Sequence, residues 1–449
     1  MIASSVIEEV RRRVDAVAVV RSKLELRESG SSYIGTCPFH EGREESFHLY
    51  HREKRFRCHA CGAHGDVFEL VERLEGRPFG TVVRELASGA GVVVSAEDLS
   101  TEEERVRGER KALLSACEAA ASAFERNLWG EEGGAARAYL SSRGVSEAVA
   151  RTFRLGYALP GWHELERSLK DARIPPEVQC AAGLVVAKVE GKGPGSFDRF
   201  RDRVVFPLRD ARGRIIGFAG RLVRIGPGPT YLGGPETPIF KRNRSLLGLW
   251  EAREEIRRTG RAILVEGFFD TVILHQAGFT DAVALGGTSV AREQVELLEE
   301  SGCREAVLLF DGDEAGARAP SSAAPVFLKA GLTATVASLA AIHARSDPDS
   351  FVLSSGTARL QEVLAAARPL TEHLIDEALR RSTGEIREPA AVEHKLAALR
   401  DLAPLVLSAP EGIRRNAFEK AVARRLGFDV GPLRLEVRRL EREARRGVP

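Results

Sequence analysis

Four potential metal ligands near the N-terminus constrain the fold of this chain more than any other sequence feature. Cys37 and His40 are separated by two residues, and Cys58 and Cys61 repeat that spacing further along the chain. The short gap lets both side chains of a pair bind one ion from a single tight turn, and three thiolates with one imidazole complete a tetrahedral zinc site. Such a site has no open position for a substrate. The pattern predicts one structural zinc ion in an N-terminal zinc ribbon, with the chemistry elsewhere.

Two alternatives to this ligand set stay open at this point. His59 and His64 lie close to the second cysteine pair and compete with His40 for the histidine position, although their spacing fits less well. Alternatively, the four residues are unrelated reactive or core side chains. The remaining cysteines lie in helical or apolar segments, which favours buried free thiols: Cys117, Cys180 and Cys303. Thiols without a disulfide framework are typical of a reducing cytoplasm.

Length and charge limit the classes of protein that this chain can belong to. Its 449 residues are enough for about three domains with cores of their own. Its 66 basic and 64 acidic residues give a net charge of +2, so any site for a polyanion must come from local clustering. No signal peptide and no apolar run of membrane-spanning length is visible, and we expect no membrane partner.

The order of apolar and polar segments predicts a multidomain protein that combines α+β and α/β parts. A helix over 67–74 is expected to close the zinc ribbon, because its apolar residues have helical spacing. The polar residues 96–108 lack apolar periodicity and are interpreted as a linker. The predicted domains are a zinc-binding domain at 1–95, the linker at 96–108, a mixed α/β basic lobe at 109–255, a parallel-sheet core at 256–355 and a helical segment at 356–449.

The clearest pattern lies between residues 261 and 311. Short apolar segments at 261–266, 281–286 and 306–311 alternate with helical segments at 268–276 and 289–300. This order predicts a parallel sheet covered by helices. A further strand is expected at 333–339.

Acidic residues follow these predicted strands. Because the carboxyl ends of parallel strands meet at one edge of a sheet, we expect the acids to gather there. Clustered carboxylates repel one another, and Mg²⁺ or Mn²⁺ relieves that repulsion. The alternative is that each acid caps a helix or lies in a solvated loop. The candidate metal ligands are Glu266, Asp270, Asp311, Asp313, Asp347 and Asp349.

A second candidate site is basic. Arg199, Arg201 and Arg203 alternate along the chain, and Arg221 and Arg224 follow later. Period two on a strand predicts that the first three arginines share one face of a sheet. Guanidinium groups bind phosphates by charge and by bidentate geometry, although a solvated arginine face is the alternative.

These segments together resemble the bacterial DNA primase family over nearly the whole chain. The zinc-ligand pairs and Gly65-Asp-Val-Phe68 are similar to the zinc-binding domain of that family. The segments 199–207, 217–221, 231–232 and 235–240 are similar to its basic catalytic lobe. Glu266-Gly-x₂-Asp270, the segment 285–289, Asp311-Gly-Asp313 and Asp347-Pro-Asp349 resemble its TOPRIM core.

The resemblance implies a primase that makes short RNA primers on single-stranded DNA from ribonucleoside triphosphates during DNA replication. It implies catalytic roles for Glu266, Asp311 and Asp313, two or more Mg²⁺ or Mn²⁺ ions on the acidic cluster, and a zinc domain that engages the template. It also implies a bacterial cytoplasmic location at the nucleoid. The residues expected to contact template or nucleotide are Arg143, Arg199, Arg201, Arg203, Arg221, Tyr231 and Arg242.

The chain departs from the family pattern at several positions. Thr230 and Arg242 each stand where the family usually has lysine, and only Arg242 keeps the charge. The helical domain by which the family docks on the replicative helicase is not expected in 356–449. Two rival hypotheses are another TOPRIM nuclease or topoisomerase and a catalytically impaired primase-like protein that binds single-stranded DNA. None of the five tyrosines has the setting of a strand-breaking residue.

Overall fold

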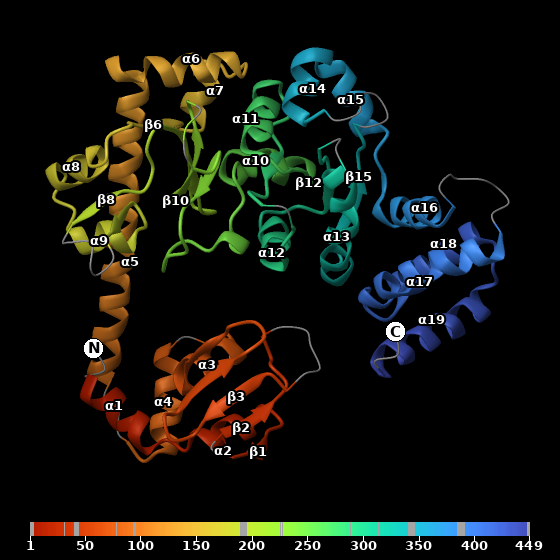
Figure 1. The fold of residues 1–449 in the computed structure, drawn as a ribbon, viewed down its shortest axis with the longest axis horizontal. Coiled ribbons are helices and arrows are strands. Elements are labelled where there is room, and N and C mark those ends of the chain that lie inside the picture. The colour runs from red at the N-terminus through yellow and green to blue at the C-terminus, as the bar shows by residue number, and fades with distance from the viewer. Residues whose placement is uncertain are drawn as a thin grey trace. The chain divides into compact units, whose positions relative to one another are not determined.

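The protein is described here by a computed structural model. It describes residues 4–30, 32–39, 45–77, 79–92, 96–188, 195–224, 226, 228–287, 289–311, 314–339, 346–383 and 391–446. The chain divides into two compact units, Met1–Lys111 and Ala112–Pro449, whose elements are labelled in Figure 1.

The first unit contains an antiparallel sheet of order β1-β2-β3-β4-β5. Its strands are β1 (Arg27–Ser29), β2 (Ser32–Gly35), β3 (Phe47–Tyr50), β4 (Arg55–Cys58) and β5 (His64–Asp66), and its helices are α1 (Ser4–Arg13), α2 (Ala16–Arg21), α3 (Val67–Glu75) and α4 (Phe79–Gly89). Phe47 and Phe56 stack on neighbouring strands with ring centroids 5.5 Å apart, and both are buried. The zinc ribbon expected from the cysteine spacing therefore has a small sheet and core of its own.

Helix α3 confirms the helix expected at 67–74. Asp66 caps its first turn by accepting hydrogen bonds from the backbone N–H groups of Phe68 and Glu69, and the Glu69 side chain bonds back to Asp66. Gly76 ends the helix in the left-handed conformation at φ 63°. These caps fix α3 directly after β5.

Residues 96–108, which the sequence indicates as a linker, are helical. They form the first part of α5 (Ala96–Trp129), a helix of 34 residues that spans the boundary between the two units. Glutamate and arginine are good helix formers, and a helix between domains needs no apolar face. The polarity of this segment therefore did not indicate its conformation.

The second unit begins with helices and a sheet of order β11-β10-β9-β6, in which all neighbours are antiparallel. Its strands are β6 (Gly156–Ala158), β9 (Arg203–Arg209), β10 (Ile215–Leu222) and β11 (Tyr231–Gly233), and a separate hairpin pairs β7 (Val185–Ala187) with β8 (Ser196–Asp198). The helices around them are α6 (Gly134–Ser142), α7 (Glu147–Thr152), α8 (Glu164–Asp171) and α9 (Pro176–Ala181), with 3₁₀ turns η1 (Glu131–Gly133) and η2 (Arg242–Arg244).

A second sheet confirms the predicted parallel core. Its order is β13-β12-β14-β15-β16, and all pairs are parallel except that of β15 with β16. The strands are β12 (Arg261–Val265), β13 (Ala282–Ala284), β14 (Glu305–Leu308), β15 (Thr333–Val336) and the edge strand β16 (Arg368–Pro369). Its helices are α10 (Leu249–Thr259), α11 (Phe268–Gln276), α12 (Arg292–Glu300), α13 (Glu314–Ala330), α14 (Pro348–Ser355) and α15 (Thr357–Ala365).

The C-terminal helices confirm the helical segment expected after residue 356. They are α16 (Leu370–Thr383), α17 (Val392–Ser408), α18 (Ile413–Leu426) and α19 (Val430–Arg446). Figure 1 shows them in blue beyond β15 and α13. No helix among the described residues combines the length and the apolar character needed to cross a bilayer.

Both faces of the parallel sheet are buried, which explains its continuous apolar strands. On β12, Ile263 and Val265 belong to the core that also contains Val205 and Phe218 of the antiparallel sheet. Ala262 and Leu264 face the opposite core, which reaches the C-terminal helices. One continuous core therefore joins the antiparallel and parallel sheets and holds the site between them in a set geometry.

Candidate zinc centre and acidic pocket

Three of the predicted zinc ligands meet in the first unit. Cys37 follows β2, Cys58 ends β4 and Cys61 lies in the turn that follows, and their Sγ atoms all lie within 4.8 Å of one another. The Sγ atoms of Cys37 and Cys61 are 3.9 Å apart. Separate turns thus bring together three soft ligands at a distance that suits one tetrahedral zinc ion.

The surroundings of Cys58 favour the thiolate that zinc requires. Burial raises the pKa of this thiol, but hydrogen bonds outweigh burial and bring its pKa to about 6. The donors include the backbone N–H of Cys61 at 3.4 Å and the Ser46 hydroxyl at 3.4 Å. Burial and the neighbouring Cys58 and Cys61 thiols raise the pKa of Cys37, so of these two thiols Cys58 is the more readily held as a thiolate in the ion-free chain. The residue types of the donor set fit zinc.

The histidine ligand is not settled by these residues. His40 lies outside the described residues. His59 Nε2 is 3.3 Å from the Tyr50 hydroxyl, and His64 Nδ1 is 2.9 Å from the carbonyl oxygen of Gly62. In the part of the chain that the structure describes, neither histidine joins the cysteine cluster.

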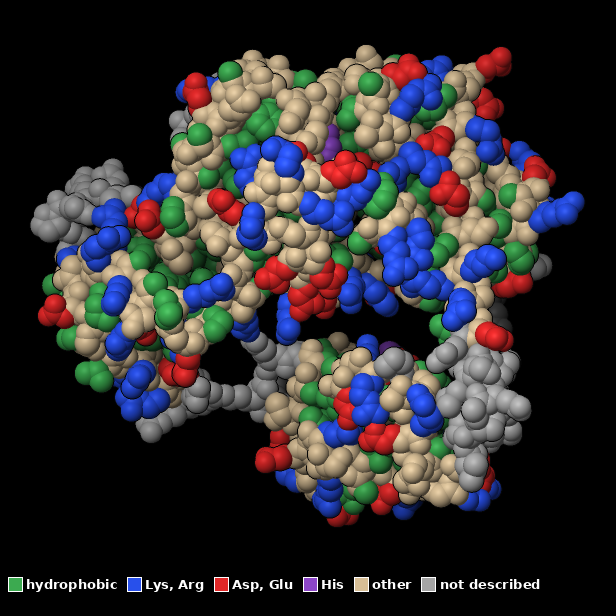
Figure 2. All heavy atoms as spheres, turned by 180° about the vertical axis from the view of Figure 1, so that it is seen from behind, with side chains coloured by type: hydrophobic (Ala, Val, Ile, Leu, Met, Phe, Trp, Pro, Cys, Tyr) green, Lys and Arg blue, Asp and Glu red, His purple; other side chains and the backbone are tan. Residues whose placement is uncertain are grey.

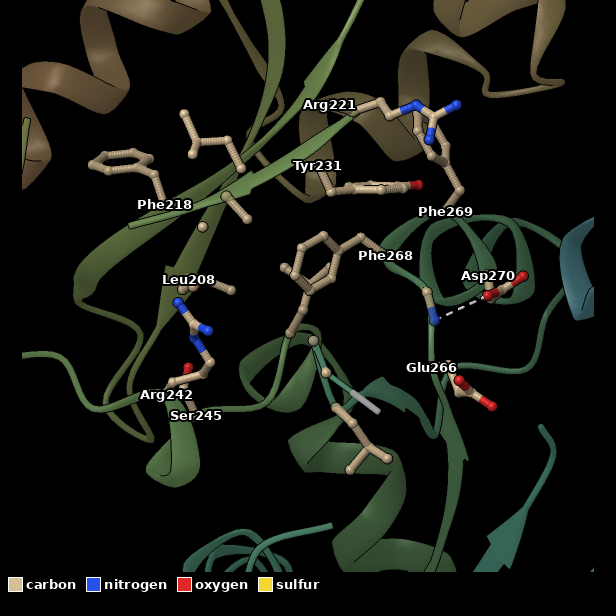
Figure 3. Close-up of a pocket in the computed structure, with 18 of the residues that line it drawn as sticks. Leu208, Phe218, Arg221, Tyr231, Arg242, Ser245, Glu266, Phe268, Phe269 and Asp270 are labelled. Carbon is tan, nitrogen blue, oxygen red and sulfur yellow. Dashed lines mark hydrogen bonds between the residues drawn. The ribbon is translucent and has the colours of Figure 1, made fainter. Parts of the chain in front are cut away.

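The acidic residues gather at the carboxyl edge of the parallel sheet, as expected. Glu266 directly follows β12, and Asp311 follows β14. Asp347 is the N-cap residue of α14. Together with Asp270 and Asp349 they line a pocket of about 630 Å³, part of which Figure 3 shows. Asp313 lies outside the described residues.

Asp270 is one of the almost completely buried carboxylates of this pocket. It is 5 % exposed, and its Oδ2 atom accepts a hydrogen bond of 3.1 Å from the backbone N–H of Gly267, drawn as a dashed line in Figure 3. Burial, the nearby Asp349 carboxylate and other acids of the cluster raise the pKa of Asp270 to about 8. A group of oxygen ligands under this mutual repulsion fits a hard divalent cation.

Arg143 pairs with one of the acids. Its guanidinium forms an ion pair with the Asp349 carboxylate, which is buried, and lies 4.8 Å from the centre of the Phe269 ring. A cation therefore already lies beside the carboxylate cluster, supplied by the C-terminal end of α6.

The opposite wall of the pocket is basic and aromatic. Arg221 from β10, Tyr231 from β11 and Arg242 from η2 all line it. Arg221 donates from Nε to the Tyr139 hydroxyl at 3.0 Å, and its guanidinium lies 4.6 Å from the centre of the Tyr231 ring. Figure 3 shows Arg221 and Tyr231 above Phe268, and Arg242 on the side of the view opposite Glu266.

The prediction that Arg199, Arg201 and Arg203 share one strand face is wrong. Arg199 and Arg201 lie in the connection between β8 and β9, and only Arg203 belongs to a strand. Asp202 has φ 51°, a left-handed conformation that interrupts the extended backbone the period-two argument assumed. The three side chains consequently point to different environments.

Their contacts show the difference. Arg203 is 5 % exposed and donates to the carbonyl oxygens of Gly220, Pro229 and Thr230 at 3.2, 2.7 and 3.1 Å. Arg199 donates to the carbonyl oxygen of Gly233, which lines the acidic pocket, at 3.3 Å. Arg203 is therefore a structural support for the segment before β11.

Sequence reasoning missed the aromatic floor of the pocket. Phe268 and Phe269 follow Glu266 at the start of α11, and the Phe268 ring lies 6.2 Å from the Tyr231 ring and 5.5 Å from the Phe206 ring. The sequence did contain a signal for it. Two phenylalanines stand at the expected start of the helix that follows the strand ending before Glu266, where polar residues are usual.

Neither positive nor negative side chains dominate the protein as a whole. Figure 2 shows basic and acidic side chains mixed over the face that it presents, in keeping with the net charge of +2. The separation of arginines and carboxylates on two walls of one pocket is thus a local feature of the site.

Three family models match the chain in succession. The CHC2 zinc finger matches residues 2–102, the N-terminal domain of the DNA primase catalytic core matches residues 123–253, and a Toprim-like model matches residues 263–352.

Curated relatives and solved structures agree with these models. The DNA primase of Myxococcus xanthus is 38 % identical over 424 residues, which cover 94 % of this chain and 67 % of the relative. A crystal structure of the zinc-binding and RNA polymerase domains of Aquifex aeolicus primase is 30 % identical with a TM-score of 0.61, and the match covers 95 % of this chain and 98 % of that chain. A DnaG primase catalytic domain bound to single-stranded DNA is 31 % identical with a TM-score of 0.63, covering 73 % and 99 % of the two chains. The chain spans about two thirds of the length of these curated relatives, 67 % of the Myxococcus xanthus primase and 64 % of a DNA primase of Pseudomonas putida that is 33 % identical.

Proposed function

The chain belongs to the DNA primase family, and we propose that it synthesises short RNA primers on single-stranded DNA from ribonucleoside triphosphates during DNA replication. The observation that carries this proposal is a single pocket in which Glu266, Asp311 and neighbouring acids face Arg221 and Arg242. Nucleotidyl transfer needs both walls, one for divalent cations and one for phosphates.

The acidic wall is proposed to hold two or more divalent cations, Mg²⁺ or Mn²⁺. Glu266, Asp311 and Asp313 are the proposed catalytic ligands, and Asp270, Asp347 and Asp349 complete the set. Bound cations would neutralise phosphate charge and lower the pKa of the attacking 3′-hydroxyl. The carboxylates come from strand ends and helix starts joined to one core, so they are pre-oriented before substrate arrives.

The basic wall is proposed to position nucleotide and template. Arg221 and Arg242 present guanidinium groups to phosphates, while Tyr231 offers a ring that is 43 % exposed and held by Arg221 and Phe268. Arg143 and Arg199 are proposed to contribute from the margins of the same pocket. Thr230 lacks a charge that the family usually carries at this place, and neighbouring arginines are proposed to compensate for it.

The zinc-binding unit is proposed to engage the template with one structural Zn²⁺ ion. Cys37, Cys58 and Cys61 supply three ligands, and His40 is the proposed fourth. A bacterial cytoplasmic location at the nucleoid follows from the proposed role. A replicative helicase is a further candidate partner, although its usual docking domain is not expected within 356–449.

The test is an assay of purified protein with single-stranded DNA, Mg²⁺ and ribonucleoside triphosphates, with products resolved by length. We expect short oligoribonucleotides made de novo, and their loss in Asp311→Ala. Glu305→Gln is a matched control, because Glu305 lies at the opposite end of β14 and outside the pocket. DNA cleavage without synthesis would point to the nuclease or topoisomerase hypothesis, and DNA binding without either reaction would point to a catalytically impaired protein.

A further inference from the structure

A tyrosine that does not line the acidic pocket holds an arginine that does. The Tyr139 hydroxyl, on α6, accepts a hydrogen bond of 3.0 Å from Nε of Arg221 on β10. Arg221 lines the pocket, whereas Tyr139 is half-buried and does not belong to the pocket lining. The two residues are 82 positions apart, so this bond is a tertiary contact between α6 and β10.

Arg221 differs from a neighbouring arginine in the kind of partner that it has. Arg224, three residues later, forms an ion pair of 2.8 Å with the Asp202 carboxylate. Arg221 forms no ion pair with a carboxylate of the described residues, and its contacts are the Tyr139 hydroxyl and the ring of Tyr231. A phenol is neutral at physiological pH, so it orients the guanidinium without cancelling its charge. The positive charge of Arg221 is therefore kept for a ligand.

The hydrogen bond also selects which face of the guanidinium meets the ligand. An arginine has five N–H donors in a planar fork, and Tyr139 occupies only the one on Nε of Arg221. The two terminal amino groups remain, and they have the spacing that binds two oxygens of one phosphate. Figure 3 shows the Arg221 side chain beside Tyr231 in the wall of the pocket.

Tyr139 is itself fixed by a contact next to the acids. Its ring meets that of Phe269 edge to face at a centroid distance of 6.0 Å, and Phe269 is buried beside Asp270 in α11. Arg143, one helical turn after Tyr139, lies 4.8 Å from the centre of the same Phe269 ring and pairs with Asp349. The end of α6 therefore contacts the basic wall through Tyr139 and the acidic wall through Arg143.

The acids lie in the neighbourhood of Arg221. Burial raises the pKa of the Tyr231 hydroxyl to about 12, while the charge of Arg221 lowers this pKa and that of Asp270 raises it, so both charged groups lie near one hydroxyl. An arginine side chain is flexible, and beside uncompensated carboxylates it would pair with one of them, as Arg143 does with Asp349. Such a pair would remove charge from both walls of the pocket.

We propose that Tyr139 is a positioning residue for the basic wall: its hydroxyl holds Arg221 in the orientation that binds template phosphates and keeps it from pairing with the acids. The hydroxyl touches neither substrate nor metal and acts through Arg221 alone. This inference rests on the proposed function and adds to it the residue that keeps the two walls of the pocket apart.

The test is a double-mutant cycle in the full chain with Tyr139→Phe and Arg221→Gln. Two ligands are titrated, single-stranded DNA of about 16 nucleotides by fluorescence anisotropy and Mn²⁺ by calorimetry. Tyr139→Phe should weaken DNA binding by about two- to tenfold, which is the effect of one hydrogen bond on an equilibrium constant. It should also weaken Mn²⁺ binding several-fold, because the released Arg221 competes for the carboxylates.

In the Arg221→Gln background, Tyr139→Phe should change neither affinity, because the residue through which Tyr139 acts is gone. Phenylalanine keeps the ring that contacts Phe269, and unchanged tryptophan fluorescence checks that the fold is kept. Tyr157→Phe is the matched control. It removes a hydroxyl that donates to the Asp202 carboxylate at 2.7 Å, and neither of these residues lines the pocket. Its effect on DNA binding should be the same factor with and without Arg221→Gln.

The possible outcomes separate this inference from the proposed function. If Tyr139→Phe weakens DNA binding by the same factor in both backgrounds, or binds both ligands as the wild type does, the positioning role is refuted while the proposed function stands. Weaker DNA binding with unchanged Mn²⁺ affinity would overturn the claim that Tyr139 keeps Arg221 from the acids. If the wild type binds no single-stranded DNA, the proposed function itself fails.

Discussion

The backbone N–H of Asp349 donates a hydrogen bond of 2.9 Å to Oδ1 of Asp270, although 79 positions separate the two residues in the chain. This bond joins the start of α14 to the start of α11, so two helices from different parts of the sequence fix the distance between two carboxylates. The neighbouring Asp349 side chain is in turn bound by Arg143. The acidic cluster is therefore held together by contacts within the protein itself.

Asp270 should make the metal-free protein less stable as the pH rises. Its pKa is raised to about 8 in the folded chain, whereas an unfolded aspartate titrates near pH 4. Between these values the folded state binds more protons than the unfolded state, so the free energy of unfolding falls as pH increases. In EDTA, Asp270→Asn should remove this slope and gain about 2–5 kcal/mol at pH 8, at about 1.4 kcal/mol per pKa unit.

The measurement is denaturant unfolding followed by tryptophan fluorescence. All three tryptophans, Trp129, Trp162 and Trp250, lie in the second unit and report on it alone. Added Mg²⁺ or Mn²⁺ should stabilise the wild type at pH 8 and have little effect on the variant. An unchanged slope in Asp270→Asn would show that another group titrates in this window.

Loss of Cys58 should release zinc and unfold only the first unit. Cys58→Ser removes a buried ligand that also accepts hydrogen bonds from its own turn, and small zinc ribbons depend on the metal for their stability. Metal analysis should show loss of the ion, while tryptophan fluorescence of the second unit stays native. The same metal analysis on His40→Ala, His59→Ala and His64→Ala identifies the fourth ligand; retention of zinc in His40→Ala would contradict its assignment.

Removing Arg143 should change metal and template binding in opposite directions. Its guanidinium neutralises Asp349, so Arg143→Gln should bind Mn²⁺ several-fold more tightly, because a competing positive charge is gone. The same variant should bind single-stranded DNA more weakly by a similar factor. Calorimetry measures the first effect and anisotropy the second. Arg221→Gln is the comparison, because Arg221 contacts Tyr139 and Tyr231 and should weaken DNA binding with little change in Mn²⁺ affinity.

Replacing Arg203 should act mainly on the free energy of unfolding of the second unit. Arg203→Met leaves the carbonyl oxygens of Gly220, Pro229 and Thr230 without their buried donor, and an unsatisfied buried polar group costs about 1–3 kcal/mol. We expect a loss of at least about 2 kcal/mol in the free energy of unfolding of the second unit. Arg201→Ala should cost less than about 1 kcal/mol, since Arg201 is partly exposed. Equal losses in the two variants would contradict the assigned contacts.

The local order of apolar and polar residues was enough to predict much of the architecture. Helix α11 was expected at 268–276 and occupies Phe268–Gln276, and the strands before and after it were expected from their apolar runs. The parallel arrangement followed from the alternation of strands and helices, and it placed Glu266 and Asp311 at one edge. Buried parallel strands are continuous apolar segments, so their signal is strong and independent of distant residues.

The positions of the arginines at 199, 201 and 203 were less predictable, because they depend on the backbone conformation of Asp202. The alternation of Arg199, Arg201 and Arg203 indicated a strand, but Asp202 adopts φ 51° and turns the chain before β9 begins. Its carboxylate accepts hydrogen bonds from the Tyr157 hydroxyl and the Arg224 guanidinium, contacts that no local pattern contains. Arg203 then enters the core and Arg201 stacks on Trp162.

The sequence by itself determined the two kinds of ligand that this protein offers, thiols in spaced pairs and carboxylates after apolar strands, because both depend on residue type and on spacing within a few positions. Only the tertiary structure decided which side chains share a pocket. Contacts between residues far apart in the chain pair Asp270 with Asp349 and Arg143 with Asp349. Such a contact, with Trp162, also holds Arg201, which does not line the acidic pocket. Those contacts form when the two sheets pack on one core, and residue order alone does not specify them.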